Sequence, residues 1–326
     1  MIKYLFLILV TLLSGCTTDF SGLDKPEESV YIRFTSHADI KADIEEASYT
    51  KRQKTRDGNT STEQSVGILG IATHEDMMTE TTFAGHDAAS LRQWMANDVY
   101  HRNPSTGDIT HEDGESPLFP IDKGSAIVAC AYMPHTDKVV FSADDCYIPI
   151  DLMADSATTD WRYSGRNAMS KSEYREKGTF ALDTLKHVMT RLDLILHSNV
   201  NRTNKKVKIL EIDLGIRNNG KGKLSLDNGK LTLDSDTYEP GTVHRLVRRP
   251  NLEFSLYDDL KDSIRTERYY LLPYTEILDL RIVSVWNEQD TITYEYTIAD
   301  RAQWDSSNLH PGKRSTINVR SIKYIN

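Results

Sequence analysis

Short segments rich in β-branched and aromatic residues, separated by turn-forming residues, follow one another along most of the chain. The clearest cover residues 30–34, 66–72 and 125–133, and the last stops at Pro134. Such side chains pack well on a pleated surface, so these segments favour strands. Short strands at this spacing are typical of β-sandwiches, and the sequence predicts an all-β protein with antiparallel sheets. Further strands are expected at 138–142, 147–153, 191–197, 207–214, 252–256, 268–272, 277–285, 291–297 and 316–324.

The spacing of these strands predicts two β-sandwich domains in tandem, 30–175 and 176–326. The polar stretch 164–177 is the expected linker, and 198–206 is an alternative boundary. Asp-Asn-Gly at 227–229 separates two short alternating segments, which predicts a hairpin. One short helix is expected over 87–98, because Leu91, Trp94 and Met95 recur at helical spacing.

The N-terminus has the layout of an export signal. Lys3 precedes an apolar run over residues 4–13, and Cys16 follows Ser14 and Gly15. This layout is that of a signal peptide ending in small residues, and it is similar to a bacterial lipoprotein box. The run is too short to span a bilayer. We expect a signal peptide over 1–15, lipidation of Cys16 and a polar tether over 16–29; a plain signal peptide with an incidental Cys16 is the alternative.

Composition narrows the range of partners. The formal net charge of −9 argues against a nucleic-acid partner, because phosphates require a basic surface. Thr17, rather than an aspartate, follows Cys16, which favours the outer membrane as the site of anchoring.

Cys130 and Cys146 remain after lipidation of Cys16. They are either a disulfide, as an oxidising export compartment permits, or two buried free thiols.

No motif in the sequence points to catalysis. The ten histidines lack a ligand-like spacing, and His74 has no second histidine four residues on, as a zinc-protease helix requires. A nucleophile elbow and a glycine-rich phosphate loop are also missing from the sequence. We therefore expect no enzymatic activity, no cofactor and no metal site.

Several short motifs occur in an order that carries a family resemblance. They are Ala131-Tyr132-Met133-Pro134, Asp151-Leu152-Met153-Ala154, the segment from Phe180 to Leu192, and Pro311-Gly312-Lys313 leading to Ile317-Asn318-Val319. Together with the lipoprotein box, this order resembles the fimbrillin-like lipoproteins of Bacteroidetes-type bacteria, which are the subunits of protease-assembled (type V) pili. Ser315 departs from the family pattern, which usually has an aromatic residue there, and Met133 replaces a second tyrosine.

The resemblance implies two transthyretin-like sandwich domains and assembly by strand exchange. A trypsin-like protease would cut after Arg56 or Arg52, in the loop that follows the first strand. The released strand would carry Val30, Tyr31, Ile32 and Phe34, and a strand from another pilus subunit would replace it. The donor strand of this chain would carry Ile317, Val319, Ile322 and Tyr324. Because the first pair and the second pair lie on opposite faces, a bulge or two pairing segments would be needed. The resemblance thus implies an outer-membrane lipoprotein precursor that becomes part of a cell-surface fimbrium used in adhesion.

Two other functions are left open by the sequence. The first is an outer-membrane surface lipoprotein that binds glycans by stacking sugars on tryptophans. Trp94, Trp161, Trp286 and Trp304 are the candidates; Trp286 is expected in the core and Trp161 on the surface. The second is a sandwich hydrolase with two carboxylates in a cleft. A C-terminal strand that simply completes its own domain is the alternative to a donor strand.

Overall fold

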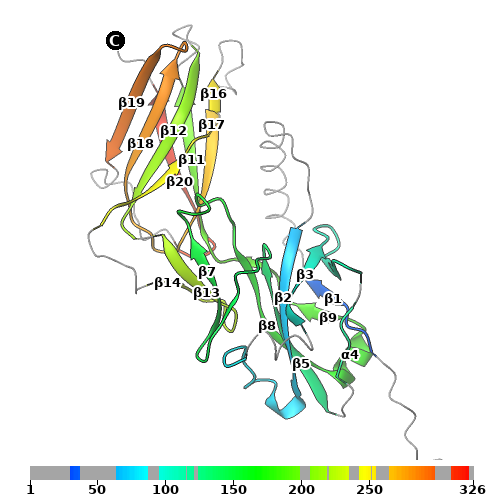
Figure 1. Cartoon of the computed structure of the whole chain (residues 1–326). Coiled ribbons are helices and arrows are strands. Elements are labelled where there is room, and N and C mark those ends of the chain that lie inside the picture. The colour runs from blue at the N-terminus through cyan, green and yellow to red at the C-terminus, as the bar shows by residue number, and fades with distance from the viewer. Residues whose placement is uncertain are drawn as a thin grey trace, which may run out of the picture.

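The computed structural model describes residues 30–36, 64–86, 95–114, 116–120, 124–198, 206–218, 220–234, 242–250, 252–254, 264–297 and 310–322. These residues confirm an all-β protein: apart from a 3-10 turn at Glu75–Met77, the helical content described is α4 (Lys171–Lys177). Figure 1 shows an elongated molecule with the N-terminal strands near one end and the last strands near the other. Across the described ranges, no helix is both long and apolar enough to cross a membrane.

The N-terminal part contains a large sheet and a small one. The large sheet has eight strands in the order β10-β8-β5-β2-β3-β4-β1-β9, and the small sheet has four, β14-β13-β7-β6. The strands are β1 (Phe34–Ser36), β2 (Gln64–His74), β3 (Met95–Arg102), β4 (Asp108–His111), β5 (Ser125–Met133), β6 (Val140–Phe141), β7 (Cys146–Asp151), β8 (Arg162–Ser170), β9 (Phe180–Leu182), β10 (Lys186–His187), β13 (Lys221–Ser225) and β14 (Leu231–Leu233).

The C-terminal part contains two further sheets. One has the order β17-β11-β20, and the other runs β15-β12-β18-β19 with β16 also paired to β12. The strands are β11 (Thr190–Ser198), β12 (Val207–Ile216), β15 (His244–Arg248), β16 (Leu252–Phe254), β17 (Ile264–Leu271), β18 (Ile277–Trp286), β19 (Asp290–Thr297) and β20 (Arg314–Ile322). Leu192, Leu194 and Leu196 of β11 are buried and recur with the two-residue period of one face of a strand.

Strand pairing is antiparallel except at two places in the described residues. β1 runs parallel to β9, and β20 runs parallel to β11. The expectation of purely antiparallel sheets is therefore wrong at these two pairs. Both exceptions fall on the segments that the sequence singled out, residues 30–34 and 316–324.

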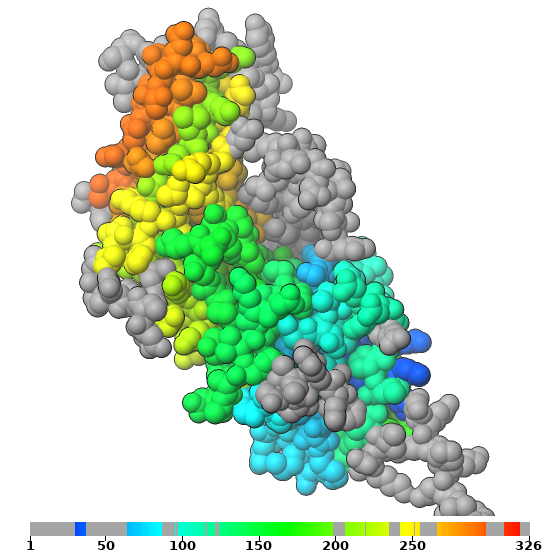
Figure 2. All heavy atoms as spheres, viewed as in Figure 1, coloured from blue at the N-terminus to red at the C-terminus, as the bar shows by residue number. Residues whose placement is uncertain are grey.

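β5 is buried on both faces and joins two apolar clusters. Ile127 and Ala129 contribute to a cluster with β1, while Cys130 and Tyr132 face a larger cluster that continues into the C-terminal sheets. This double burial explains the uninterrupted apolar run of the strand. In Figure 2 the green atoms from the middle of the chain lie between the cyan atoms of the N-terminal part and the yellow atoms of the C-terminal part.

The hairpin expected at 227–229 forms between β13 and β14, and β13 pairs with β7 from the first half of the chain. Its turn is fixed to the large sheet by hydrogen bonds. Asp227 accepts from the backbone N–H of Phe83 (2.5 Å) and of Ala84 (3.1 Å). The Tyr163 hydroxyl donates to the carbonyl of Leu226 at 2.6 Å. The C-terminal half of the sequence therefore completes the core of the N-terminal part.

Gly229, in the same turn, is expected to be intolerant of a side chain. It has φ +69°, and an added Cβ would lie 2.2 Å from the Tyr163 ring. Gly229→Ala should lower the free energy of unfolding by about 2–4 kcal/mol, from left-handed strain and overpacking together. Gly114→Ala is a matched control, with φ +75° and nothing within 4 Å of the added Cβ. It should cost only about 1 kcal/mol in denaturant unfolding, and equal losses would contradict the packing argument.

Three expectations about the N-terminal half are wrong. Residues 95–98 belong to strand β3 rather than to a helix, because Met95 and Tyr100 enter the core from one face of a strand paired with β2. The polar stretch 164–177 is not a linker, since it forms most of β8 together with α4. A division at residue 175 would also separate β9 and β10 from the sheet with which they pair. Polar composition was misleading here because the polar groups of β8 are bonded inside the protein; Ser164, for example, is buried and donates to the carbonyl of Gly165.

Candidate functional site

The first described segment, residues 30–36, is built into the large sheet as an inner strand. On one side Phe34 and Thr35 pair antiparallel with Ile109 and Asp108 of β4. On the other side residues 34–36 pair parallel with 180–182 of β9. Since β1 lies between two strands, its removal would open the sheet between β4 and β9.

The upstream half of the segment is held by the chain at 117–119. The Ile32 N–H donates to the carbonyl of Pro117 at 2.7 Å, and the Phe119 N–H donates to the carbonyl of Val30 at 2.8 Å. Tyr31 forms an isolated bridge with Leu118. These bonds extend the pairing of β1 beyond its assigned bounds.

Alternate side chains of the segment fill the core. Ile32 is 1% exposed and Phe34 is 2% exposed. The Phe34 ring meets the Tyr100 ring edge-to-face at a centroid distance of 5.9 Å, and it packs at a tilt against the Phe180 ring at 5.4 Å. Arg33, between them, points to solvent. The segment is therefore an amphipathic strand with its apolar face inserted.

Helix α4 holds the segment through one hydroxyl group. The Tyr174 hydroxyl accepts from the Arg33 N–H at 2.8 Å and donates to the carbonyl of Tyr31 at 2.7 Å. The helix is fixed at its N-terminus because the Ser170 hydroxyl accepts from the Glu173 N–H. It ends at Gly178, which has φ 72°. Sequence reasoning missed Tyr174, because the helix lies in the stretch that was expected to be a linker.

Tyr174→Phe should lower the free energy of unfolding by about 1–2 kcal/mol, because two backbone groups of the segment lose their hydrogen-bond partner. Tyr274→Phe is the control, since Tyr274 is 63% exposed and should change stability very little. Denaturant unfolding followed by circular dichroism measures both. Hydrogen exchange at Arg33 should accelerate only in Tyr174→Phe, and unchanged exchange there would contradict the assignment.

The downstream end of the segment is fixed by a buried arginine. Arg102 donates through Nε to the Ser36 hydroxyl at 3.0 Å and through Nη1 to Oε1 of Gln64 at 2.9 Å. Ser36 and Gln64 flank residues 37–63, which contain Arg52 and Arg56. One side chain thus holds both ends of the segment in which cleavage was expected. Cys16, Arg52 and Arg56 themselves lie outside the described residues.

The expected donor strand is seated within its own domain. β20 is the outer strand of its sheet, with Arg314 opposite Arg191 and Ile317 opposite Leu194. Val319 is 4% exposed, and Ile317 packs against the same core. The register shifts where Leu196–Ser198 faces Val319–Ile322, at the change of face noted in the sequence. Tyr324 lies outside the described residues.

A buried charge cluster connects β20 to the rest of its sheet. Asp193 of β11 is 0% exposed and accepts from Arg191 (3.0 Å) and Arg268 (3.3 Å), and it forms an ion pair with Arg314 of β20 (2.7 Å). Burial alone would raise the pKa of Asp193, but the Arg191 hydrogen bond and the three positive charges together hold that pKa below its usual range. Sequence reasoning missed this cluster because Arg268 and Arg314 come from strands far from Asp193 in the chain.

Cys130 and Cys146 are free and buried in the structure. Burial raises the pKa of Cys146 to about 12 and raises that of Cys130 as well. Both groups therefore stay protonated at neutral pH, as inert packing thiols do. This is the second of the two alternatives that the sequence left open, and the disulfide stays a prediction for oxidising conditions.

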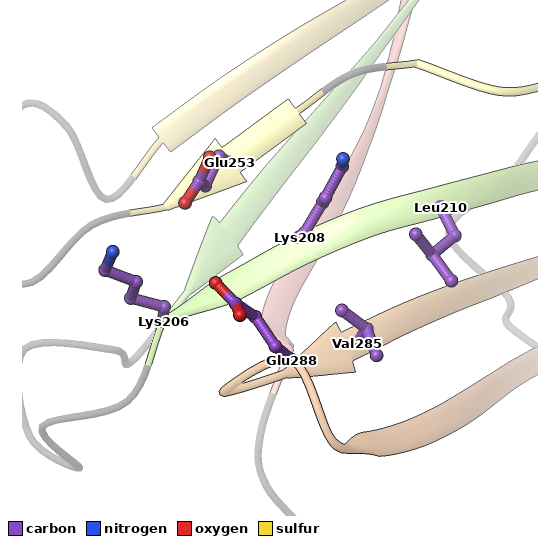
Figure 3. Close-up of a pocket in the computed structure, with 6 residues that line it drawn as sticks. All are labelled: Lys206, Lys208, Leu210, Glu253, Val285 and Glu288. Carbon is purple, nitrogen blue, oxygen red and sulfur yellow. The ribbon is translucent and has the colours of Figure 1, made fainter.

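A shallow cavity of about 360 Å³ lies on the C-terminal sheet. Figure 3 shows its six lining residues: Lys206, Lys208 and Leu210 on or beside β12, Glu253 on β16, Val285 on β18 and Glu288 just after it. The lining has two positive and two negative charges and no aromatic ring, so it offers no stacking platform for a sugar. Within the described residues, no group of three or more histidine, cysteine or acidic side chains could hold a metal ion.

The two described tryptophans do not supply a stacking platform either. Trp286 is 0% exposed, which confirms its expected place in the core. Trp161 is only 8% exposed, so the expectation that it lies on the surface is wrong. It packs on Tyr132 with a centroid distance of 6.4 Å. Trp94 and Trp304 lie outside the described residues.

These features define an all-β protein whose described residues form four sheets and whose first described strand is inserted between two others. No protein-family profile and no curated protein matches the sequence. Among solved structures, a candidate cell adhesion protein from Bacteroides uniformis matches over 91% of this chain and 94% of its own, with 14% identity and a TM-score of 0.55. The two proteins therefore share a fold.

Two fimbrial proteins from Porphyromonas gingivalis are also similar, but more distantly. The anchor protein Mfa2 covers 83% of this chain and 82% of its own, at 11% identity and a TM-score of 0.30. The tip protein Mfa3 covers 91% and 96%, at 10% identity and a TM-score of 0.33. These scores are too low to establish a common arrangement.

Proposed function

We propose that this protein is a structural, non-catalytic subunit of a protease-assembled (type V) pilus that contributes to adhesion. It is exported as a lipoprotein precursor, anchored in the outer membrane by a lipid on Cys16. A trypsin-like protease cuts after Arg56 or Arg52, and the subunit then joins other pilus subunits in a cell-surface fimbrium. The observation that carries this proposal is the inserted strand at residues 30–36, which immediately precedes the arginine-bearing segment.

The geometry of the inserted strand supports the exchange step. Its backbone is paired on both sides and Ile32 and Phe34 fill the core, so its loss would expose apolar pockets and unpaired backbone groups together. A strand from another subunit can satisfy both, through main-chain hydrogen bonds and alternate side chains. Arg102 bonds both Ser36 and Gln64, so the first strand can stay in place after the chain is cut between them, until another strand replaces it.

The C-terminal strand supports the donor role. β20 is an outer strand, and its Arg314 reaches Asp193 from a half-exposed position. Detaching it would break one strand pair and leave the rest of the sheet in place. The proposal includes two transthyretin-like sandwiches, with the division after β10 and with the β13–β14 hairpin returning to the first of them.

The proposal is tested by cleaving the folded, lipid-free precursor with an arginine-specific protease, followed by N-terminal sequencing and gel analysis. We expect one cut after Arg52 or Arg56, followed by SDS-resistant ladders. A variant with both arginines changed to glutamine is the control and should give neither the cut nor the ladders. If the natural precursor resists the protease, or if it is cut but the gel shows only monomers, the polymerising role is contradicted.

A further inference from the structure

Residues 30–36 occupy a space between β4 and β9, which we call the seat of the first strand. Its surroundings favour a particular side-chain pattern in any strand that occupies it. Ile32 and Phe34 are buried in apolar surroundings, and Arg33 between them is exposed. Thr35 is half-buried, and Ser36 is a buried polar residue bonded to Arg102. The residues that occupy the seat are, in order, apolar, cationic, aromatic, β-branched and polar.

The C-terminal segment of the same chain repeats this order. Ile322-Lys323-Tyr324-Ile325-Asn326 matches Ile32-Arg33-Phe34-Thr35-Ser36 in chemical class at every position. The amide oxygen of Asn326 can accept from Arg102, as the hydroxyl of Ser36 does. Arg320 would fall at the position of Val30, which is only partly buried, where its stem can follow apolar surface while its charge stays in solvent.

The aromatic position differs by one hydroxyl group, and the seat contains a possible partner for it. Tyr100 is 2% exposed, and its hydroxyl has no hydrogen-bond partner among the described residues. Its ring meets the Phe34 ring edge-on at 5.9 Å. Burial raises the pKa of Tyr100, so the hydroxyl keeps its proton and can donate or accept. Phe34 has no polar side-chain atom that could pair with this group, whereas a tyrosine hydroxyl can donate or accept a hydrogen bond.

We infer that the seat accepts residues 322–326 of a second copy of this chain in register with residues 32–36, and that Tyr100 is the residue that selects Tyr324. The Tyr324 ring takes the pocket of Phe34, and its hydroxyl pairs with that of Tyr100. This inference rests on the proposed strand exchange. An unsatisfied buried hydroxyl disfavours the resident strand, so the pocket favours the incoming tyrosine over Phe34.

The pocket can be tested in the intact chain without any assembly. Phe34→Tyr should raise the melting temperature by about 2 °C, because the Tyr100 hydroxyl gains a partner. In a Tyr100→Phe background the same change should lower the melting temperature, since the new hydroxyl is then the unpaired one. If Phe34→Tyr lowers the melting temperature as much in the natural protein as it does in the Tyr100→Phe background, the proposed role of Tyr100 is overturned.

The occupant is tested with synthetic peptides on the full chain nicked after Arg52 or Arg56. A peptide of residues 320–326 should bind about tenfold more tightly than the same peptide with Tyr324→Phe, as one buried hydrogen bond of ordinary strength implies. This preference should vanish on the Tyr100→Phe protein. Equal binding of the two peptides, or a preference that survives in Tyr100→Phe, would overturn the assigned register.

The two experiments separate failure of the inference from failure of the proposed function. If neither peptide binds to the nicked protein, strand exchange itself is contradicted, and the assignment of residues 322–326 falls with it. If both bind equally, exchange stands and only the register is wrong. The melting experiment reports on the Tyr100 pocket in either case.

Discussion

Replacement of Asp193 by alanine is expected to lower the free energy of unfolding by about 3–5 kcal/mol, the range for breaking a buried ion pair from one side. Asp193 is fully buried and is the carboxylate on which Arg191, Arg268 and Arg314 converge. Arg268 is only 5% exposed, so the loss of the carboxylate leaves positive charge inside the sheet. Denaturant unfolding of the full chain measures the effect.

A surface ion pair in the same half of the protein provides the control. Arg217 and Glu276 lie 2.8 Å apart but are 49% and 39% exposed. Glu276→Ala should therefore change stability by less than about 1 kcal/mol. Comparable losses in Asp193→Ala and Glu276→Ala would show that the buried cluster has no special role. In Asp193→Ala the β20 strand should also become more accessible to protease, because Arg314 loses its anchor.

The same carboxylate predicts a pH dependence. The pKa of Asp193 in the folded protein is below its usual range, so the unfolded chain binds a proton more readily. The stabilisation is therefore complete above the ordinary aspartate pKa of about 3.9 and is lost as the pH falls through the lowered folded pKa. Unfolding measured between about pH 6 and pH 2 should show a shallower acid dependence in Asp193→Asn than in the natural protein.

Phe34→Ala should cost about 3–5 kcal/mol, as expected for a fully buried aromatic side chain. Phe34 lies between Tyr100 and Phe180, and its removal would leave a cavity in the seat of the first strand. The loss should be accompanied by faster hydrogen exchange along residues 30–36. The same change should therefore weaken retention of the strand once the chain is cut.

Tyr31→Ala is the matched control for this prediction, because it lies on the same strand and points outward. Its side chain is 61% exposed, so the substitution should change stability by no more than about 0.5 kcal/mol. The difference between the stability losses of the two variants measures the contribution of the buried face of the strand, apart from that of the strand as a whole. If both variants lose the same stability, burial in the seat does not account for retention of the strand.

The strands were largely predictable because their signal is local. β5 stops at Met133 before Pro134, and the turn at 227–229 joins two short strands, as their residues indicated. An extended segment over residues 30–34 was expected for the same reason, but the sequence left open which of its side chains face the core. What failed was the reading of polar composition, since β8 and α4 occupy a stretch that contains few apolar residues.

Only one component of the candidate site, the inserted strand, could be predicted from the sequence. The sequence identified the strand that is inserted, but not the groups that hold it: Tyr174, Arg102 and the 117–119 segment. These partners lie far from residues 30–36 in the chain, and each is unremarkable in its own neighbourhood. Tyr100 could not have been singled out either, because its lack of a partner is a property of the folded core.

The sequence by itself therefore determined the all-β character of this protein and the faces of its strands. Both follow from the two-residue period of side chains along an extended backbone, which is set within a few residues. Only the tertiary structure decided that the 221–233 hairpin joins β7, that β1 runs parallel to β9 and β20 parallel to β11, and that three arginines surround Asp193. Strand pairing and buried charge join residues far apart in the chain, so local pattern cannot specify them.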